Sequence, residues 1–140
     1  MTERLYFAYG SNLDPRQMTE RCPGAKPMGA ATLEGWRFLI NRRGYATVTP
    51  EPDSVVQGGL WVLTPAHEVE LDEYEGVAGG HYTKEQLEVI HASARSKALV
   101  YVDPVSEPGR PWPGYMEGVL HGAAHFDLPN EYLAELKTWQ

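Results

Sequence analysis

The chain has 140 residues, of which 42% are hydrophobic, 11% aromatic and 22% charged. This composition and length are typical of one globular domain, here spanning residues 1–140, and no apolar run is long enough for a membrane span. The net charge of −7 argues against a nucleic acid as the main partner, because such binding needs clustered lysine and arginine side chains.

The N-terminus and the single cysteine bear on the cellular compartment. Residues 1–4 lead directly into the first predicted strand, so we expect no export signal. Cys22 is the one cysteine of the chain and cannot form an internal disulfide, which suits a reducing environment. We therefore expect a soluble, cytoplasmic protein that binds a small molecule and has no membrane or nucleic-acid partner.

The first predicted strand, residues 5–9, ends abruptly at Gly10 and is followed by two small polar residues. Asp14 and Pro15 then form a helix-start signal for a helix over residues 15–21. A strand, a glycine turn and a helix N-terminus in this order aim several backbone amides into one small volume. The stretch is therefore either a cradle for an anion or oxyanion, or an ordinary strand-to-helix turn.

Four more strands are predicted in the first half of the chain, each a run of apolar and β-branched residues bounded by glycine or proline. They cover residues 28–33, 36–41, 45–49 and 55–63. Residues 34–35 are expected to form the turn between the first two strands, and residues 50–54 a loop before the last. Gly58 and Gly59 indicate a bulge or a close backbone approach within the last strand.

The second half of the chain opens with Thr64 and Pro65, which begin a short acidic helix that ends before Gly76. Two strands and two helices follow, namely strands over residues 81–90 and 97–102 and helices over residues 114–125 and 129–139. The two strands are expected to pair across a turn at residues 92–96. Residues 103–114 hold four prolines and two glycines, which predicts a surface loop.

Glu75 is the last residue of the acidic helix, where a negative charge meets the unfavourable end of the helix dipole. This position raises the pKa of a carboxyl group, and burial would raise it further, toward the value that a general acid or base needs near neutral pH. Five acidic residues fall between positions 68 and 75, however, so the helix could instead present an ordinary solvated acidic face.

His121 and His125 are spaced i, i+4 in a predicted helix, as in some zinc sites. The residues between them are Gly-Ala-Ala and lack the glutamate of a zinc protease, so we predict no metal site and interpret both as surface or packing histidines. Ser11 lacks the second glycine of a nucleophile elbow. We therefore interpret it as a turn residue or a substrate contact and not as a nucleophile.

Two motifs together resemble the γ-glutamylcyclotransferase family, including its AIG2-like and BtrG-like members. They are YFAYGSNL at residues 6–13 and LDEYEGV at residues 71–77, in the order that the family has them. Further segments at residues 44–48, 55–61, 80–82 and 113–123 are similar to their family counterparts in order and spacing. The resemblance implies an α+β fold, a small mixed β-barrel flanked by short helices, and leads us to expect a homodimer.

The resemblance also implies where the site lies. The family's catalytic acid/base is the glutamate immediately before Gly-Val, which corresponds to Glu75. The family's substrate cradle is the tyrosine–glycine–serine–asparagine turn, and tyrosines close to the glutamate or the substrate complete the site. The corresponding residues here are Tyr9, Gly10, Ser11, Asn12, Leu13, Tyr82 and Tyr115.

The implied reaction needs no cofactor and no nucleophile from the protein. A γ-glutamyl substrate carries its own nucleophile, the α-amine, which closes a ring on the γ-carbonyl and releases 5-oxoproline and a free amine. The protein must supply proton transfer, which Glu75 can provide, and donors for the oxyanion or the substrate carboxylate, which the amides of residues 10–13 can provide. Two alternatives stay open: the same chemistry on a γ-glutamyl-amine, isopeptide or biosynthetic carrier, and a non-catalytic binding or regulatory module on this fold.

Overall fold

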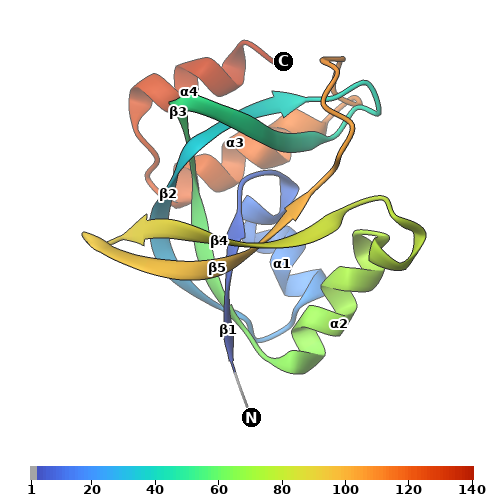
Figure 1. Cartoon of the computed structure of the whole chain (residues 1–140), viewed down its shortest axis with the longest axis vertical. Coiled ribbons are helices and arrows are strands. Elements are labelled where there is room, and N and C mark those ends of the chain that lie inside the picture. The colour runs from blue at the N-terminus through green and yellow to red at the C-terminus, as the bar shows by residue number, and fades with distance from the viewer. Residues whose placement is uncertain (1–2) are drawn as a thin grey trace.

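The computed structural model describes residues 3–140, whose five strands close a barrel in the order β1-β3-β2-β4-β5 (Figure 1). The strands are β1 (Arg4–Ala8), β2 (Lys26–Ile40), β3 (Ala46–Leu63), β4 (Thr83–His91) and β5 (Ala94–Val102). Neighbouring strands pair antiparallel, except that β1 runs parallel to β5 where Tyr6 faces Leu99, and this pair closes the barrel. The small mixed barrel expected from the family resemblance is confirmed.

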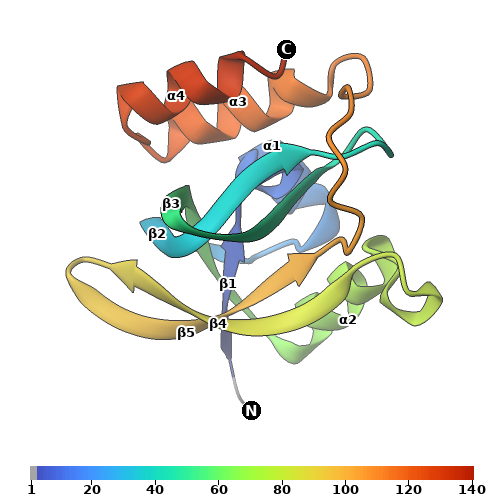
Figure 2. The ribbon, with the colours of Figure 1, turned by 45° about the horizontal axis from the view of Figure 1, so that its top comes forward.

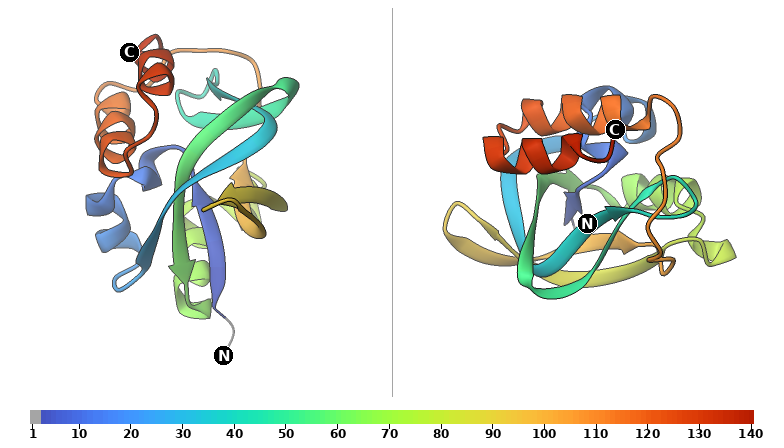
Figure 3. Two further views of the ribbon diagram at one scale, coloured as in Figure 1. Left: turned by 90° about the vertical axis from the view of Figure 1, so that its left-hand side faces the viewer. Right: turned by 90° about the horizontal axis from the view of Figure 1, so that it is seen from above.

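The strands β2 and β3 are longer than the sequence predicts, and they curve together around the barrel (Figure 3). The prediction of a turn at residues 34–35 is wrong, because Gly35, with a φ of +83°, bends one strand without ending it. The predicted loop over residues 50–54 is also wrong. Residues 51–54 form a bulge of β3 opposite that bend, and pairing with β2 resumes at Val55.

The hairpin of β4 and β5 turns through Ala92 and Ser93 alone, and not through residues 92–96 as predicted. The φ values of these two residues are 50° and 65°, the left-handed values that a two-residue hairpin turn requires. Residues other than glycine, asparagine and aspartate seldom adopt these values, so the sequence does not indicate a turn at this position. As a result β5 begins at Ala94 and not at residue 97.

The four α-helices of residues 3–140 and two short 3₁₀ helices flank the barrel. They are α1 (Pro15–Arg21), α2 (Pro65–Tyr74), α3 (Tyr115–His125), α4 (Asn130–Lys137), η1 (Ser11–Leu13) and η2 (Val77–Gly79). Asp14 and Thr64 cap α1 and α2, as their sequences predict. The helices α3 and α4 lie side by side and antiparallel above β2 and β3 (Figure 2). In the described part of the chain no helix combines the length and the apolar character that crossing a membrane requires.

Glycines let the helices and the barrel approach each other closely. A Cβ atom on Gly122 of α3 would lie only 2.2 Å from the carbonyl carbon of Leu13, so α3 packs directly on the backbone of η1. A Cβ atom on Gly58 would lie 2.3 Å from the carbonyl oxygen of Ala8. Because β1 and β3 stay in register there, the predicted glycine pair of β3 marks a close approach and not a bulge.

The helices α1 and α2 contact each other through Cys22, the residue that follows α1. Its side chain is buried, and its thiol lies 3.6 Å from the carbonyl oxygen of His67. The ring of His67 in turn lies 2.7 Å from the carbonyl oxygen of Pro23. This contact fixes the end of α1 against α2.

The predicted loop over residues 103–114 is anchored to the barrel by Asp103, whose side chain is completely buried. Its carboxylate accepts hydrogen bonds of 2.9 Å from the Asn41 side-chain amide and from the backbone N–H of Val105. The Thr47 hydroxyl donates to the backbone carbonyl of Asp103, also at 2.9 Å. A buried negative charge is thereby held close to the start of β3.

Candidate active site

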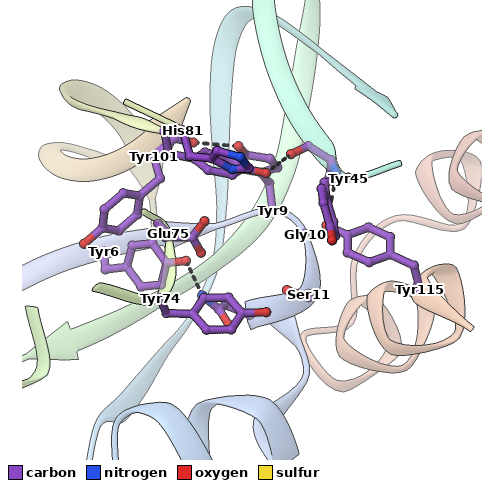
Figure 4. A pocket seen from close by; sticks show the side chains of 13 residues that line it. Tyr6, Tyr9, Gly10, Ser11, Tyr45, Tyr74, Glu75, His81, Tyr101 and Tyr115 are labelled. Carbon is purple, nitrogen blue, oxygen red and sulfur yellow. Dashed lines mark hydrogen bonds between the residues drawn. The ribbon is translucent and has the colours of Figure 1, made fainter. Parts of the chain in front are cut away.

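One cavity of about 300 Å³ opens where β1 ends, between η1, the start of β3, the C-terminal end of α2 and the start of α3 (Figure 4). Every predicted site residue except Leu13 lines it, namely Tyr9, Gly10, Ser11, Asn12, Glu75, Tyr82 and Tyr115. These residues come from both halves of the chain. The structure therefore brings the turn at the end of β1 and the glutamate at the end of α2 to the same cavity.

The turn after β1 is a single 3₁₀ turn, and this geometry decides which of its amides are available. The N–H of Leu13 donates to the Gly10 carbonyl at 3.0 Å. Within residues 3–140 the N–H groups of Gly10, Ser11 and Asn12 find no acceptor. Leu13 differs from the other predicted site residues, because its amide is occupied and its side chain is fully buried in the core. The three free amides at the cavity are the donors that an anion or oxyanion could use.

Glu75 caps the C-terminal end of α2, and Gly76 ends the helix by adopting the left-handed conformation. Burial is the largest influence on its carboxyl group and raises the pKa from 4.5 to about 7. The positive charge of Arg21 lowers this pKa, and the buried charge of Asp103 raises it. Within the described residues the carboxylate accepts no hydrogen bond and forms no ion pair, so it is free to accept a proton from a ligand.

Tyr82 and Tyr115 are both tied to one residue, Ala46, at the start of β3. The Tyr82 hydroxyl donates to the Ala46 carbonyl at 2.9 Å, and the Ala46 N–H donates to the Tyr115 oxygen at 3.1 Å. Burial raises the pKa of Tyr115 to about 12 and that of Tyr82 further. Both side chains are therefore neutral near pH 7 and held in fixed positions on the cavity wall.

Most of the remaining cavity wall consists of tyrosines that sequence reasoning missed. Every tyrosine of the chain except Tyr132 lines the cavity, so the accumulation of tyrosines in the sequence was the available signal. Tyr6 accepts a 2.9 Å hydrogen bond from the Asn12 side-chain amide, and Tyr9 donates one of 2.6 Å to the Tyr101 carbonyl. Figure 4 shows these rings grouped around Glu75.

Arg21, the last residue of α1, is the second feature that sequence reasoning missed. Its Nη1 donates to the Ser11 hydroxyl at 3.2 Å and to the side-chain oxygen of Asn12. Its Nη2 donates to the Tyr74 hydroxyl, and the guanidinium carbon lies 3.4 Å from the centroid of the Tyr74 ring. Tyr74 is 54% exposed, so it stands at the mouth of the cavity.

The histidine pair of α3 lies away from this cavity. His121 and His125 are both exposed, and the ring of His125 packs edge-on against Phe126 with 5.2 Å between the ring centroids. Among residues 3–140 no group of three or more histidine, cysteine, aspartate or glutamate side chains has an arrangement that could hold a metal ion.

Comparisons with known proteins agree with this architecture. The family described as gamma-glutamyl cyclotransferase, AIG2-like, matches residues 6–120. The gamma-glutamylcyclotransferases of Homo sapiens and Mus musculus are 31% identical to the chain over 147 residues, covering 96% of this chain and 77% of each relative. A solved structure named gamma-glutamyl cyclotransferase superposes with a TM-score of 0.93 at 28% identity, covering 99% of this chain and 89% of that one. The chain therefore belongs to the AIG2-like γ-glutamyl cyclotransferase family.

Proposed function

We propose that the protein is a γ-glutamylcyclotransferase that converts a γ-glutamyl amide into 5-oxoproline and a free amine. The observation that carries this proposal is that Glu75 and the turn from Gly10 to Asn12 line one cavity. A group that transfers protons and a set of unused amide donors are what this cyclisation asks of a protein. The names of the relatives and the family membership support the same reaction class.

The reaction starts when the α-amine of the substrate attacks its own γ-carbonyl carbon. A bond forms between the amine nitrogen and this carbon, and Glu75 accepts the proton that the nitrogen loses. The bond between the γ-carbon and the leaving nitrogen then breaks, and Glu75 returns the proton to that nitrogen. A carboxyl group with a pKa of about 7 suits both transfers, because neither protonation state is strongly disfavoured near neutral pH.

During this reaction the free amides of the turn donate hydrogen bonds to negatively charged groups of the substrate. They can bind the α-carboxylate of the substrate or the oxyanion that develops on the γ-carbonyl. Removing one such donor typically costs about 2.7–4 kcal/mol of transition-state stabilisation.

A module that only bound a γ-glutamyl compound is less consistent with the cavity. Its ligand would carry an α-ammonium beside the α-carboxylate, and Glu75 would bind this ammonium best as an ionised carboxylate, whereas burial raises its pKa to about 7. A proton-transferring role gives this carboxylate a use. We therefore favour turnover over binding alone.

The test is to incubate the protein with γ-glutamyl-amino acids, glutathione and γ-glutamyl-lysine and to measure 5-oxoproline. We expect release from at least one donor, and a loss of about 10²–10⁴-fold in kcat for Glu75→Gln, the range typical of one general acid–base group. The matched control is Glu73→Gln, which makes the same chemical change at an exposed position of the same helix. No 5-oxoproline from any donor would favour the binding module, and full activity of Glu75→Gln would remove that residue from the mechanism.

A further inference from the structure

Arg21 joins three residues from two different elements around the cavity. Ser11 and Asn12 belong to η1 on one side, and Tyr74 ends α2 on the other. A planar guanidinium with several N–H donors can hold such partners in one fixed arrangement, which a lysine ammonium on a flexible stem cannot do equally well. The stacked ring of Tyr74 adds a cation–π contact.

The partners of Arg21 are all neutral oxygens. Among the described residues Arg21 forms no ion pair, whereas Arg4, Arg16 and Lys84 each face an acid. Its positive charge is therefore not cancelled by a contact carboxylate. In a chain with a net charge of −7, this leaves a half-buried cation beside the turn and close enough to act on Glu75.

We propose, on the basis of the proposed cyclisation, that Arg21 is a positioning residue, which holds the Ser11–Asn12 turn and Tyr74 in one arrangement around Glu75 and supplies the positive charge that acts on its carboxylate. Arg21 itself does not line the cavity. It therefore acts through the groups that do. Its loss should both loosen the turn and make Glu75 harder to ionise.

Several other titratable groups surround Glu75, and they limit what Arg21 can do. Those that face it are Tyr6 of β1, Tyr9 between β1 and η1, Tyr45 before β3, Tyr74 of α2, His81 and Tyr82 before β4, Tyr101 of β5, Asp103 after β5, and Tyr115 of α3. Burial raises the pKa of Tyr6, Tyr9, Tyr82 and Tyr115, so these rings carry no charge near pH 7. Asp103 opposes the effect of Arg21, because its negative charge raises the pKa of Glu75.

The test compares Arg21→Met, which removes the charge at similar length, with Arg21→Lys, which keeps the charge but loses the planar fork. The first readout is a ¹³C NMR titration of glutamate side-chain carboxyl groups, with the Glu75 signal assigned by its absence in Glu75→Gln. We expect the titration of Glu75 to move up by about one pH unit in Arg21→Met, the usual effect of one nearby charge, and to stay close to the wild-type value in Arg21→Lys. Arg21→Gln is the companion variant if the methionine protein does not fold.

The second readout is the pH profile of kcat/KM for 5-oxoproline release. In Arg21→Met the acid limb of this profile should shift to higher pH, in step with the NMR titration. In Arg21→Lys the acid limb should stay at the wild-type pH, while kcat/KM falls about tenfold because the turn is held less firmly. The control is Arg95→Met, which removes one exposed positive charge far from the cavity. An unmoved Glu75 titration in both neutral variants would overturn the inference. Because the NMR readout needs no substrate, a wild-type protein without turnover would overturn the proposed function separately.

Discussion

The raised pKa of Glu75 affects stability as well as the proposed proton transfer. The folded protein binds a proton at this carboxyl group up to a pH of about 7, whereas an ordinary glutamate releases it near 4.5. Between these two values the folded state holds more protons than the unfolded state, so stability falls as the pH rises through this window. The difference corresponds to about 3 kcal/mol at pH 8, because one pKa unit is worth about 1.4 kcal/mol.

Replacing Glu75 with glutamine should therefore stabilise the protein at high pH while it lowers kcat. We expect the gain in unfolding free energy of Glu75→Gln over wild type to be close to zero at pH 4 and to rise to about 3 kcal/mol at pH 8. Urea denaturation at both pH values measures it. The exposed Glu73→Gln should show no such pH-dependent gain, and an equal gain in the two variants would mean that Glu75 is not the destabilising group.

Single residues differed in how far the sequence revealed them. Local signals made Glu75 a candidate, namely an acidic residue, a helix end and a following glycine, and the family resemblance then selected it over a solvated acidic face. Arg21 could not, because its partners Ser11 and Asn12 lie 10 and 9 positions away and Tyr74 lies 53 away. Only the packing of α1 beside α2 and η1 makes these residues neighbours.

Among the helices, α3 fixes the position of the turn at η1, because α3 packs directly on the backbone of η1. Gly122→Ala would place a methyl group 2.2 Å from the Leu13 carbonyl carbon, so the helix or the turn must move. We expect a loss of about 1–3 kcal/mol in unfolding free energy, the usual cost of overpacking, and a fall in kcat/KM because the free amides shift. Thermal denaturation and 5-oxoproline release measure the two effects.

The same helix offers a control for that substitution. A Cβ atom on Gly118 would meet its nearest neighbour, a carboxylate oxygen of Asp14, at an ordinary 3.7 Å. Gly118→Ala should therefore stabilise the protein by about 0.5–1 kcal/mol, since alanine is the better helix former, and should leave activity unchanged. A destabilised Gly118→Ala would show that α3 tolerates no added volume anywhere, and the effect of Gly122→Ala would lose its specific meaning.

The strands show where local sequence signals mislead. Glycine and proline mark strand ends in most sequences, and residues 34–35 contain a glycine while residues 50–54 contain two prolines. In the structure these two stretches face each other, so a bend in β2 and a bulge in β3 occur together while pairing continues on either side. The pairing partner decides between a turn and a bulge, and the partner is not visible in either segment alone.

The barrel as a whole is closed by two short seams. The hairpin of β4 and β5 is joined to β2 where Thr32 faces Ile90 and to β1 where Tyr6 faces Leu99. Its outer end projects from the body of the molecule (Figure 1). No local pattern of the sequence predicts this closure, because both seams join strands from opposite halves of the chain.

These seams predict uneven protection against hydrogen exchange. Amides of residues 91–96 at the outer end of the hairpin should exchange at least about tenfold faster than those of β1, which lies between β3 and β5. Hydrogen–deuterium exchange with mass spectrometry of peptides measures this difference. Equal protection in both regions would mean that the hairpin opens only when the whole barrel unfolds.

Because Cys22 is buried between α1 and α2, its reactivity reports whether these two helices separate beside the cavity. This thiol is the only one in the sequence, its side chain is 1% exposed, and burial raises its pKa to about 11. A thiol reagent can therefore react only when α1 separates from α2, so the labelling rate measures how often this separation occurs. Since Arg21 is the preceding residue, a γ-glutamyl ligand that fixes the turn should slow labelling, and an unchanged rate at saturating ligand would show that the two helices open independently of the site.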